Sequence, residues 1–329
     1  MQLITNVELP VSQYEIKHSD RLMLMGSCFA ENIGNKLYEN KFSCDINPFG
    51  ILYNPMSIHE ALTRISENRL YSSSELMENG GRWFSLMHHG SFSSPSREEC
   101  LDGINQRISA AYNNLKTADW LILTFGTSRI YRWSADGRIV GNCHKLSSRL
   151  FTRELLEVDD IVSSYTSMIS YIREINSEIK ILFTVSPIRH AKDGMHGNQI
   201  NKAVLLLAID KICNTFAGCC HYFPSYEIMM DELRDYRYYA DDMLHPSSLA
   251  VEYIWEKFSA TYFSRNTMAV MKEYDEIRKG LNHKPFDPQS ESYRKFLSQI
   301  LLKIDILKEK LPYLDVENEK LLCQTLLKK

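Results

Sequence analysis

Short apolar runs alternate along this chain with longer stretches of helical spacing, and that alternation limits the fold more than any other feature. We expect strands at Leu22–Met25, Phe42–Ile46, Trp120–Phe125, Ile179–Val185 and Cys220–Phe223. We expect helices at about 29–40, 57–67, 98–117, 156–176, 199–217 and 247–263. Strands separated by helices form parallel sheets with right-handed crossovers, so the pattern predicts a three-layer α/β/α sandwich.

Two stretches interrupt this alternation and are expected to be hairpins. Residues 82–94 alternate in polarity and lie between two expected helices. Residues 130–147 contain Asp136-Gly137, a dipeptide typical of a tight turn between two strands. Insertions of this kind commonly shape a binding pocket.

The C-terminal part of the chain has a different pattern. From about residue 266 it is helical and charged, with Leu, Ile and Phe at helical spacing over Ser290–Lys310. Single hydrophobic cores stop growing at roughly 250–300 residues. We therefore expect one α/β domain over residues 1–265 and a helical extension over residues 266–329.

Composition excludes several classes of protein. The net charge of -3 argues against a chain built to bind nucleic acid. The N-terminus lacks the apolar segment of a signal peptide, and no apolar run is long enough to span a membrane, so we expect a cytoplasmic protein. The eight cysteines form no metal-binding or disulfide pattern, and we expect free thiols, no metal and no cofactor.

The first strand runs into a glycine turn and then a helix at Gly26-Ser27-Cys28-Phe29-Ala30. A side chain at such a turn lies at the carboxyl end of a strand, where ligands of open α/β sheets bind. The N–H groups of a helix N-terminus favour a thiolate or an oxyanion. Either Ser27 or Cys28 therefore has a suitable position for a nucleophile.

The segment Asp242-Met243-Leu244-His245 is the second candidate element. It lies in a loop that ends at Pro246, just before the last helix of the α/β pattern. At this spacing a carboxylate can hold one ring nitrogen of His245, which leaves the other nitrogen to act as a base. If His245 acts as the base for a nucleophile at residues 26–28, it must share a pocket with them although the two segments are far apart in sequence.

The GSCFA string and the late D-x-x-H resemble the GSCFA family, which is grouped with the SGNH/GDSL-like hydrolases. The resemblance covers roughly residues 1–265 and implies a flavodoxin-like sandwich with a nucleophile in a G-D-S turn. Aligned without gaps, Cys28 falls at the nucleophile position, and a shift of one residue places Ser27 there. We favour Cys28, because a thiolate gains directly from the helix N-terminus, which would depress its pKa.

The same resemblance implies an oxyanion hole. The central glycine of such enzymes matches Gly50, and the G-x-N turn after the third strand matches Gly126-Thr127-Ser128. Ser128 stands where these enzymes have asparagine, and that departure weakens the expectation of ordinary esterase activity.

Four further residues are candidates for substrate binding. Asn142 leaves the second hairpin and could supply the missing amide, and His144 could be an alternative base, although a plain polar loop explains both equally well. Arg189 and His190 follow the fourth strand and could bind a carboxylate or sugar hydroxyls.

We therefore expect an enzyme that hydrolyses or transfers an acyl group from an ester or thioester. An acylated carbohydrate is the substrate suggested by analogy, with no nucleic-acid or membrane partner. One alternative is a cysteine-dependent amide hydrolase that pairs Cys28 with His144 or His245. Another is a binding module that keeps the scaffold without turnover.

Overall fold

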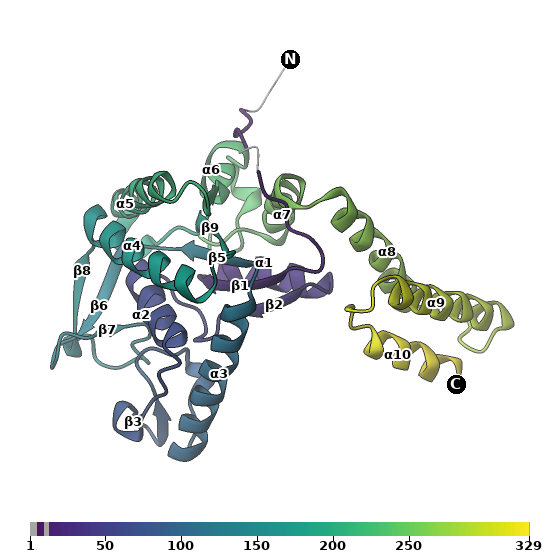
Figure 1. Ribbon diagram of the computed structural model, residues 1–329, viewed down its shortest axis with the longest axis horizontal. Coiled ribbons are helices and arrows are strands. Elements are labelled where there is room, and N and C mark those ends of the chain that lie inside the picture. Colours follow the sequence, from purple (N-terminus) through teal and green to yellow (C-terminus); the bar gives the residue numbers. More distant parts are fainter. Residues whose placement is uncertain (1–4, 10–12, 329) are drawn as a thin grey trace. The chain divides into compact units, whose positions relative to one another are not determined.

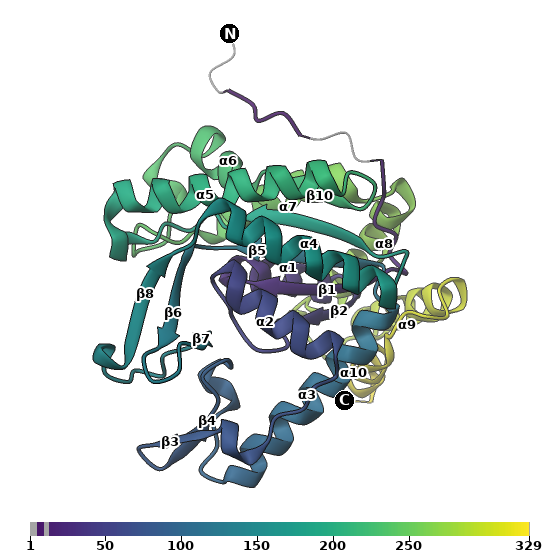
Figure 2. The same ribbon diagram turned by 60° about the vertical axis from the view of Figure 1, so that its left-hand side comes forward.

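The structure is a computed structural model that describes residues 5–9 and 13–328. The chain divides into two compact units (Figures 1 and 2). The first comprises Met1–Val11, Arg21–Asn35 and Cys44–Thr261, and the second comprises Ser12–Asp20, Lys36–Ser43 and Tyr262–Lys329. The helical extension expected from residue 266 thus belongs to a unit that also takes in two earlier segments of the chain.

The first unit contains a five-stranded parallel sheet. Its strands are β1 (Arg21–Gly26), β2 (Ser43–Ile46), β5 (Trp120–Phe125), β9 (Lys180–Val185) and β10 (Cys220–Phe223). They lie in the order β10-β9-β5-β1-β2, with Leu22 opposite Trp120 and Trp120 opposite Lys180. The chain thus builds outward from β1 in both directions, and the carboxyl ends of β1 and β5 form the switch point where such sheets bind ligands.

Helices cover both faces of this sheet. They are α1 (Cys28–Glu39), α2 (Pro55–Ser66), α3 (Arg97–Thr117), α4 (Val158–Ile175), α5 (Gly194–Thr215), α6 (Ser225–Glu227) and α7 (Ser248–Tyr262). Buried residues of α2, α3, α4 and α5 share one core with Met23, Leu121 and Phe183. On the other face, Phe29 of α1 and Phe258 of α7 border one small gap together with Leu24. The predicted three-layer sandwich is confirmed.

The burial of strand β1 on both faces explains why its sequence is a continuous apolar run. Met23 and Met25 enter the core beneath α2–α5, while Leu24 lies toward the α1 and α7 side, and all three are almost fully buried. A strand buried on both faces reads as a continuous apolar run, and apolar runs of this kind are typical of parallel sheets.

The hairpins lie outside the central sheet (Figure 2). The first is β3 (Met77–Asn79) with β4 (Arg82–Phe84), which turn at Gly80 and Gly81, both in the left-handed region. The range predicted for it, 82–94, is therefore wrong, although Trp83 does pair antiparallel with Ser94. Two consecutive glycines take positive φ without strain, so the tight turn forms there.

The second hairpin is confirmed and is larger than predicted. Strands β6 (Arg129–Trp133) and β7 (Ile139–Val140) pair antiparallel, with Gly137 at φ 75° in the turn between them. A further strand, β8 (Phe151–Leu155), pairs with the other edge of β6. Sequence analysis missed β8. Short single-turn helices make up the rest: 3-10 helices at Ser73–Glu75, Gly90–Phe92, Ser148–Leu150, Ala191–Asp193 and Tyr236–Tyr238, and a π-helix at Ile228–Glu232.

The second unit is built on α8 (Arg265–Leu281), α9 (Glu291–Lys310) and α10 (Glu317–Leu327). Leu297, Ile300, Ile304 and Leu307 of α9 are buried at helical spacing in a core that also holds Cys323 of α10. Ile16 joins this unit by a bridge to Phe263, and the N–H of Ile16 donates to the carbonyl of Tyr262. Within the described residues no helix combines the length and the apolar character needed to cross a membrane.

Candidate active site

The turn between β1 and α1 is tightly constrained. Gly26 has φ 148°, and a Cβ on this residue would lie 2.3 Å from the carbonyl oxygen of Thr124 on β5. Only glycine fits so close to a neighbouring strand. The N–H of Gly26 donates to Oδ1 of Asn47 at 2.9 Å. The residues that follow are therefore held at the switch point of the sheet.

Ser27 has a structural role at this turn. It is buried, and its Oγ accepts the N–H of Phe29 at 3.2 Å in the manner of a helix N-cap. The same hydroxyl donates to Oγ of Ser186 at 3.1 Å, a residue that follows β9. Both functions of the hydroxyl are thus used inside the protein.

Cys28 is the first residue of α1 and is only partly buried. Its own N–H and that of Phe29 lower the pKa of the thiol, as expected at a helix N-terminus. Burial has the larger effect, and the charges of Glu31 and Asp242 act in the same direction, so the pKa of Cys28 is raised. The expected depression is therefore wrong, because desolvation disfavours the thiolate more than two N–H groups favour it.

Asp242 and His245 form the pair that their spacing predicts. Oδ2 of Asp242 lies 2.5 Å from Nδ1 of His245, and Oδ1 accepts the N–H groups of Leu244 and His245, each at 2.9 Å. Met243 allows this tight loop by adopting φ 59°. The hydrogen bonds from the two N–H groups, followed by the ring of His245, lower the pKa of Asp242 to about 2. Asp242 is thus a carboxylate at neutral pH and holds Nδ1, which leaves Nε2 as the working nitrogen.

His245 lines a cavity of about 580 Å³ in the first unit. Asn142, Arg189 and His190 line the same cavity, so these four sequence candidates lie together. Neither Ser27 nor Cys28 is among the residues that line it. Cys28 nevertheless lies near the cavity. A negative charge on Cys28 adds to the effect of burial in raising the pKa of Tyr53, which does line the cavity. The charge of Asp242 in turn contributes to the raised pKa of Cys28.

The cavity wall also contains cationic residues that sequence analysis missed. Arg129, Arg153 and Lys192 join Arg189 there. Arg129 and Arg153 come from β6 and β8, the strands of the second insertion. Because β8 was not predicted, nothing in the sequence pattern connected Arg153 to the site.

The residues expected to form the oxyanion hole are engaged elsewhere. The N–H of Gly50 donates to Asn47 at 2.7 Å, and the N–H of Gly126 donates to the carbonyl of Tyr53 at 2.8 Å. The hydroxyl of Ser128 is fully buried and donates to Oδ1 of Asn201 at 3.1 Å. The structure therefore does not support these three as oxyanion donors, because none of them presents a free donor to the cavity.

His144 and Asn142 have different positions although they are near neighbours in sequence. The ring of His144 packs on Phe84 with centroids 4.2 Å apart, and its Nε2 lies 2.8 Å from the carbonyl of Ser85. His144 does not line the cavity, so the structure does not support it as a base or substrate-binding residue there. Asn142 does line it, and its Oδ1 accepts the N–H of His144 at 2.8 Å. That bond uses Oδ1 of the amide.

His190 lines the cavity as a neutral ring. Burial, with a contribution from the charge of Lys202, lowers its pKa to about 4. Its Nε2 is buried and has no hydrogen-bond partner among the described residues. A Cβ on Gly126 would lie 3.2 Å from this nitrogen, so the glycine leaves the space that the ring needs.

Lys202 of α5 is a further residue that sequence analysis missed. It is 1% exposed, and its Nζ donates to the carbonyls of Gly126 and Ser186, each at 2.7 Å. Burial lowers the pKa of Lys202 to about 7, while a negative charge on Cys28 acts in the opposite direction. One signal was available in the sequence: Lys202 has the helical spacing of the buried Leu205, Ile209 and Ile212.

No group of three or more His, Cys, Asp or Glu side chains in the described part of the chain is placed to hold a metal ion. The eight cysteines are free thiols, including the adjacent Cys219 and Cys220. The side chains that remain for chemistry are thus a thiol, an Asp–His pair and the cationic groups of the cavity.

Comparison with known proteins gives two family matches and no match to a curated protein. The model of the GSCFA family matches residues 21–258, which span the sheet, the cavity, Cys28 and the Asp242–His245 pair. The model described as the GSCFA domain protein, C-terminal domain, matches residues 274–329, within the second unit. The first match covers well over half of the chain, and this protein therefore belongs to the GSCFA family.

Proposed function

We propose that this chain is an SGNH-like acyl hydrolase or acyltransferase that acts on an ester or thioester through Cys28. The observation that carries the proposal is the Asp242–His245 pair at the edge of a cavity beside the switch point where Cys28 begins α1. A Cys, a His and an orienting carboxylate are the parts of a covalent acyl-transfer mechanism.

In the first step, Sγ of Cys28 attacks the acyl carbon and a new C–S bond forms. Nε2 of His245 accepts the thiol proton and then passes it to the departing alcohol or thiol as the original C–O or C–S bond breaks. Because burial raises the pKa of Cys28, the resting nucleophile is a thiol and needs this base. Asp242 stabilises the imidazolium that forms.

In the second step, water or an acceptor hydroxyl attacks the acyl-enzyme. His245 removes the proton of the attacking group, and the C–S bond breaks to release Cys28. Since Gly50, Gly126 and Ser128 are engaged, the proposed oxyanion donors are the amide Nδ2 of Asn142 and the N-terminus of α1. An acylated carbohydrate remains the substrate class suggested by analogy with related esterases.

The test is to trap the acyl-enzyme. We expect the full chain, incubated with a simple acetyl thioester, to carry an acetyl group on the peptide that contains Cys28, as detected by mass spectrometry. Cys28→Ala should abolish the adduct. Cys143→Ala is the control, because Cys143 is a partly exposed thiol that lines the cavity beside His245.

Other results would redirect the assignment. A fluorophosphonate adduct on Ser27, lost in Ser27→Ala, would make serine the nucleophile. An adduct that forms equally in Cys28→Ala would contradict the proposed mechanism. If no adduct forms with an ester, a thioester or an amide, the binding-module alternative replaces the enzyme.

A further inference from the structure

The cavity beside His245 has an unusual balance of charge. Four cationic side chains line it, and no aspartate or glutamate is found among the lining residues. These are Arg129, Arg153, Arg189 and Lys192. A cavity of one sign with low-dielectric walls concentrates its field on a ligand of the opposite sign.

Two of the cavity arginines share one carboxylate. The side chain of Asp193 is 4% exposed, and its Oδ1 lies 2.5 Å from Arg153 and 4.0 Å from Arg129. Because Arg129 and Arg153 share Asp193, this one carboxylate cannot neutralise the charge of both. The Nε groups of both are buried and have no hydrogen-bond partner among the described residues.

Among the described residues, the other two cations, Arg189 and Lys192, have no carboxylate partner. Arg189 contacts the sulfur atoms of Met195 and Met230 and lies over the ring of Tyr239. Nζ of Lys192 donates to the hydroxyl of Tyr131 at 2.5 Å. Within the described part of the chain neither residue makes an ion pair, so their charges are available to a ligand.

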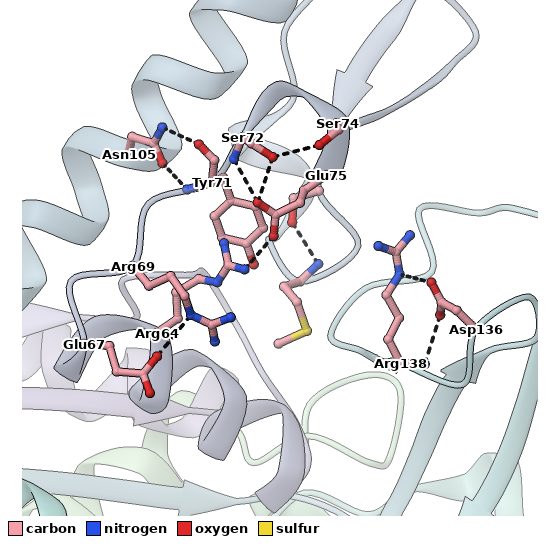
Figure 3. Close-up of polar contacts among 12 residues, drawn as sticks. Arg64, Glu67, Arg69, Tyr71, Ser72, Ser74, Glu75, Asn105, Asp136 and Arg138 are labelled. Carbon is pink, nitrogen blue, oxygen red and sulfur yellow. Dashed lines mark hydrogen bonds and ion pairs between the residues drawn. The ribbon is translucent and has the colours of Figure 1, made fainter.

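A second cavity of the first unit shows what a neutralised set of arginines looks like (Figure 3). It measures about 300 Å³, and Arg64, Arg69, Arg132 and Arg138 line it. Each of these has a carboxylate of its own: Glu75, Glu67, Glu154 and Asp136, in that order. Glu60 lines it as well. We expect no strong attraction for an anion there.

Resting on the function proposed above, we propose that the cavity beside His245 binds an acyl substrate whose non-reacting part carries a phosphate or diphosphate group. A single carboxylate would use at most two of the four cations, whereas a diphosphate presents several charges and accepts paired bonds from guanidinium groups. The volume of about 580 Å³ suits a ligand that is larger than the acyl group itself.

The test measures the binding of inorganic pyrophosphate to the full chain by calorimetry at low salt. We expect saturable binding that weakens as salt is added. The double variant Arg189→Gln/Lys192→Gln should bind roughly tenfold or more weakly, since it loses two charge-assisted contacts without leaving a carboxylate unpaired. ADP and glucose 1-phosphate, as competitors, distinguish a nucleotide-like source of the phosphate from a sugar phosphate.

The matched control is Arg69→Gln/Arg138→Gln, which removes two arginines of the neutralised cavity. It should bind pyrophosphate as the wild type does. No saturation by about 10 mM pyrophosphate, or an equal loss in both double variants, would overturn the proposal. Cys28→Ala should retain the affinity, so binding can be confirmed even if no acyl-enzyme forms, and the two proposals can fail separately.

Discussion

Burial, rather than a charge partner, sets the ionisation of the two most unusual residues near the site. It raises the pKa of Cys28 and lowers that of Lys202 to about 7, so it shifts each residue toward its neutral form. Lys202 bonds to main-chain carbonyls instead of a carboxylate. Removing a proton from Cys28 would therefore place a negative charge near a lysine that is able to take up a positive one.

Lys202→Met should change how stability depends on pH. In the folded wild type the pKa of Lys202 is about 7, whereas in the unfolded chain it has the ordinary lysine value of 10.5. Between these values the unfolded state binds more protons, so the free energy of unfolding contributed by Lys202 rises with pH. We expect the stability of the variant relative to wild type to fall by roughly 4 kcal/mol from pH 7 to pH 10.

Urea unfolding at the two pH values measures this difference, which includes any change in the pKa of Cys28, because charges on Cys28 and Lys202 interact. Lys211→Met is the control, because Lys211 lies on the same helix but is exposed and pairs with Asp159. A stability difference that does not depend on pH would show that Lys202 is charged in the folded protein throughout.

Asp242→Asn should leave the fold intact and reduce turnover by roughly 10²–10⁴-fold. An asparagine amide facing Nδ1 favours the ring tautomer that carries its proton on Nε2, and that ring cannot accept the thiol proton. An enzyme whose nucleophile is already a thiolate would lose much less turnover, but the raised pKa of Cys28 makes the base necessary. The measurement is kcat on the substrate that gives the acyl-enzyme, with the neighbouring Asp241→Asn as control. Unchanged turnover would remove Asp242 from the catalytic set.

At the scale of elements, the N-terminus of α1 combines a structural and a chemical role in adjacent residues. Ser27 caps the helix from a buried position, and Cys28 presents a partly exposed thiol. Gly26, which precedes this helix, approaches Thr124 of β5 so closely that a Cβ would not fit between them. The nucleophile position thus depends on the contact between β1 and β5.

Ser27→Ala tests this division of roles. Loss of the cap and of the bond to Ser186 should lower the free energy of unfolding by about 1–2 kcal/mol. Turnover and the Cys28 adduct should persist. Ser264→Ala removes the cap of α8 by the same chemistry and serves as the control in urea unfolding. Complete loss of turnover in Ser27→Ala alone, with the fold retained, would contradict the assignment to Cys28.

At the scale of the whole molecule, the chain makes two units with separate apolar cores. That of the first lies between the sheet and α2–α5, and that of the second lies among α8, α9 and α10. Every residue of the cavity and of the Asp242–His245 pair belongs to the first unit. We therefore expect a destabilising substitution in the second core to increase local unfolding in the second unit before it affects the first.

Leu297→Ala should test this expectation. Leu297 is fully buried in the second core, and its truncation should cost about 2–5 kcal/mol within that unit. We expect faster hydrogen exchange in α8, α9 and α10, with little change in β1, β5 and β9. Pyrophosphate affinity should be unchanged. Faster exchange in the central strands, to the same degree, would show that the two units unfold together.

The fold was largely predictable because its signals are local. All five strands of the sheet and the long helices that cover it lie within a few residues of their expected positions, since apolar runs and helical spacing are read over short windows. The three-residue helix α6 was not expected. The errors fell in the insertions. The first hairpin turns at Gly80-Gly81, earlier in the chain than expected. Strand β8 has alternating exposure and contains the polar residues Thr152 and Glu154, so it forms no apolar run.

The site was predictable only in part. The Asp242–His245 pair follows from local spacing, and Asn142, Arg189 and His190 do line the cavity. Hydrogen-bond partners distant in the chain decided the rest: Gly126 donates to Tyr53, Ser128 to Asn201, and the ring of His144 packs on Phe84. No pattern in the sequence indicates which donors will be engaged by such partners.

By itself, the sequence determined the order of elements, the glycine turn before Cys28 and the close pairing of Asp242 with His245, because each depends on neighbours a few residues away. Only the tertiary structure decided that Lys202 is buried between the ends of β5 and β9 and that Arg129 and Arg153 face the same cavity as Arg189. It also decided the ionisation of Cys28. Burial and charge depend on what surrounds a group in space, and packing assembles those surroundings from segments that lie far apart along the chain.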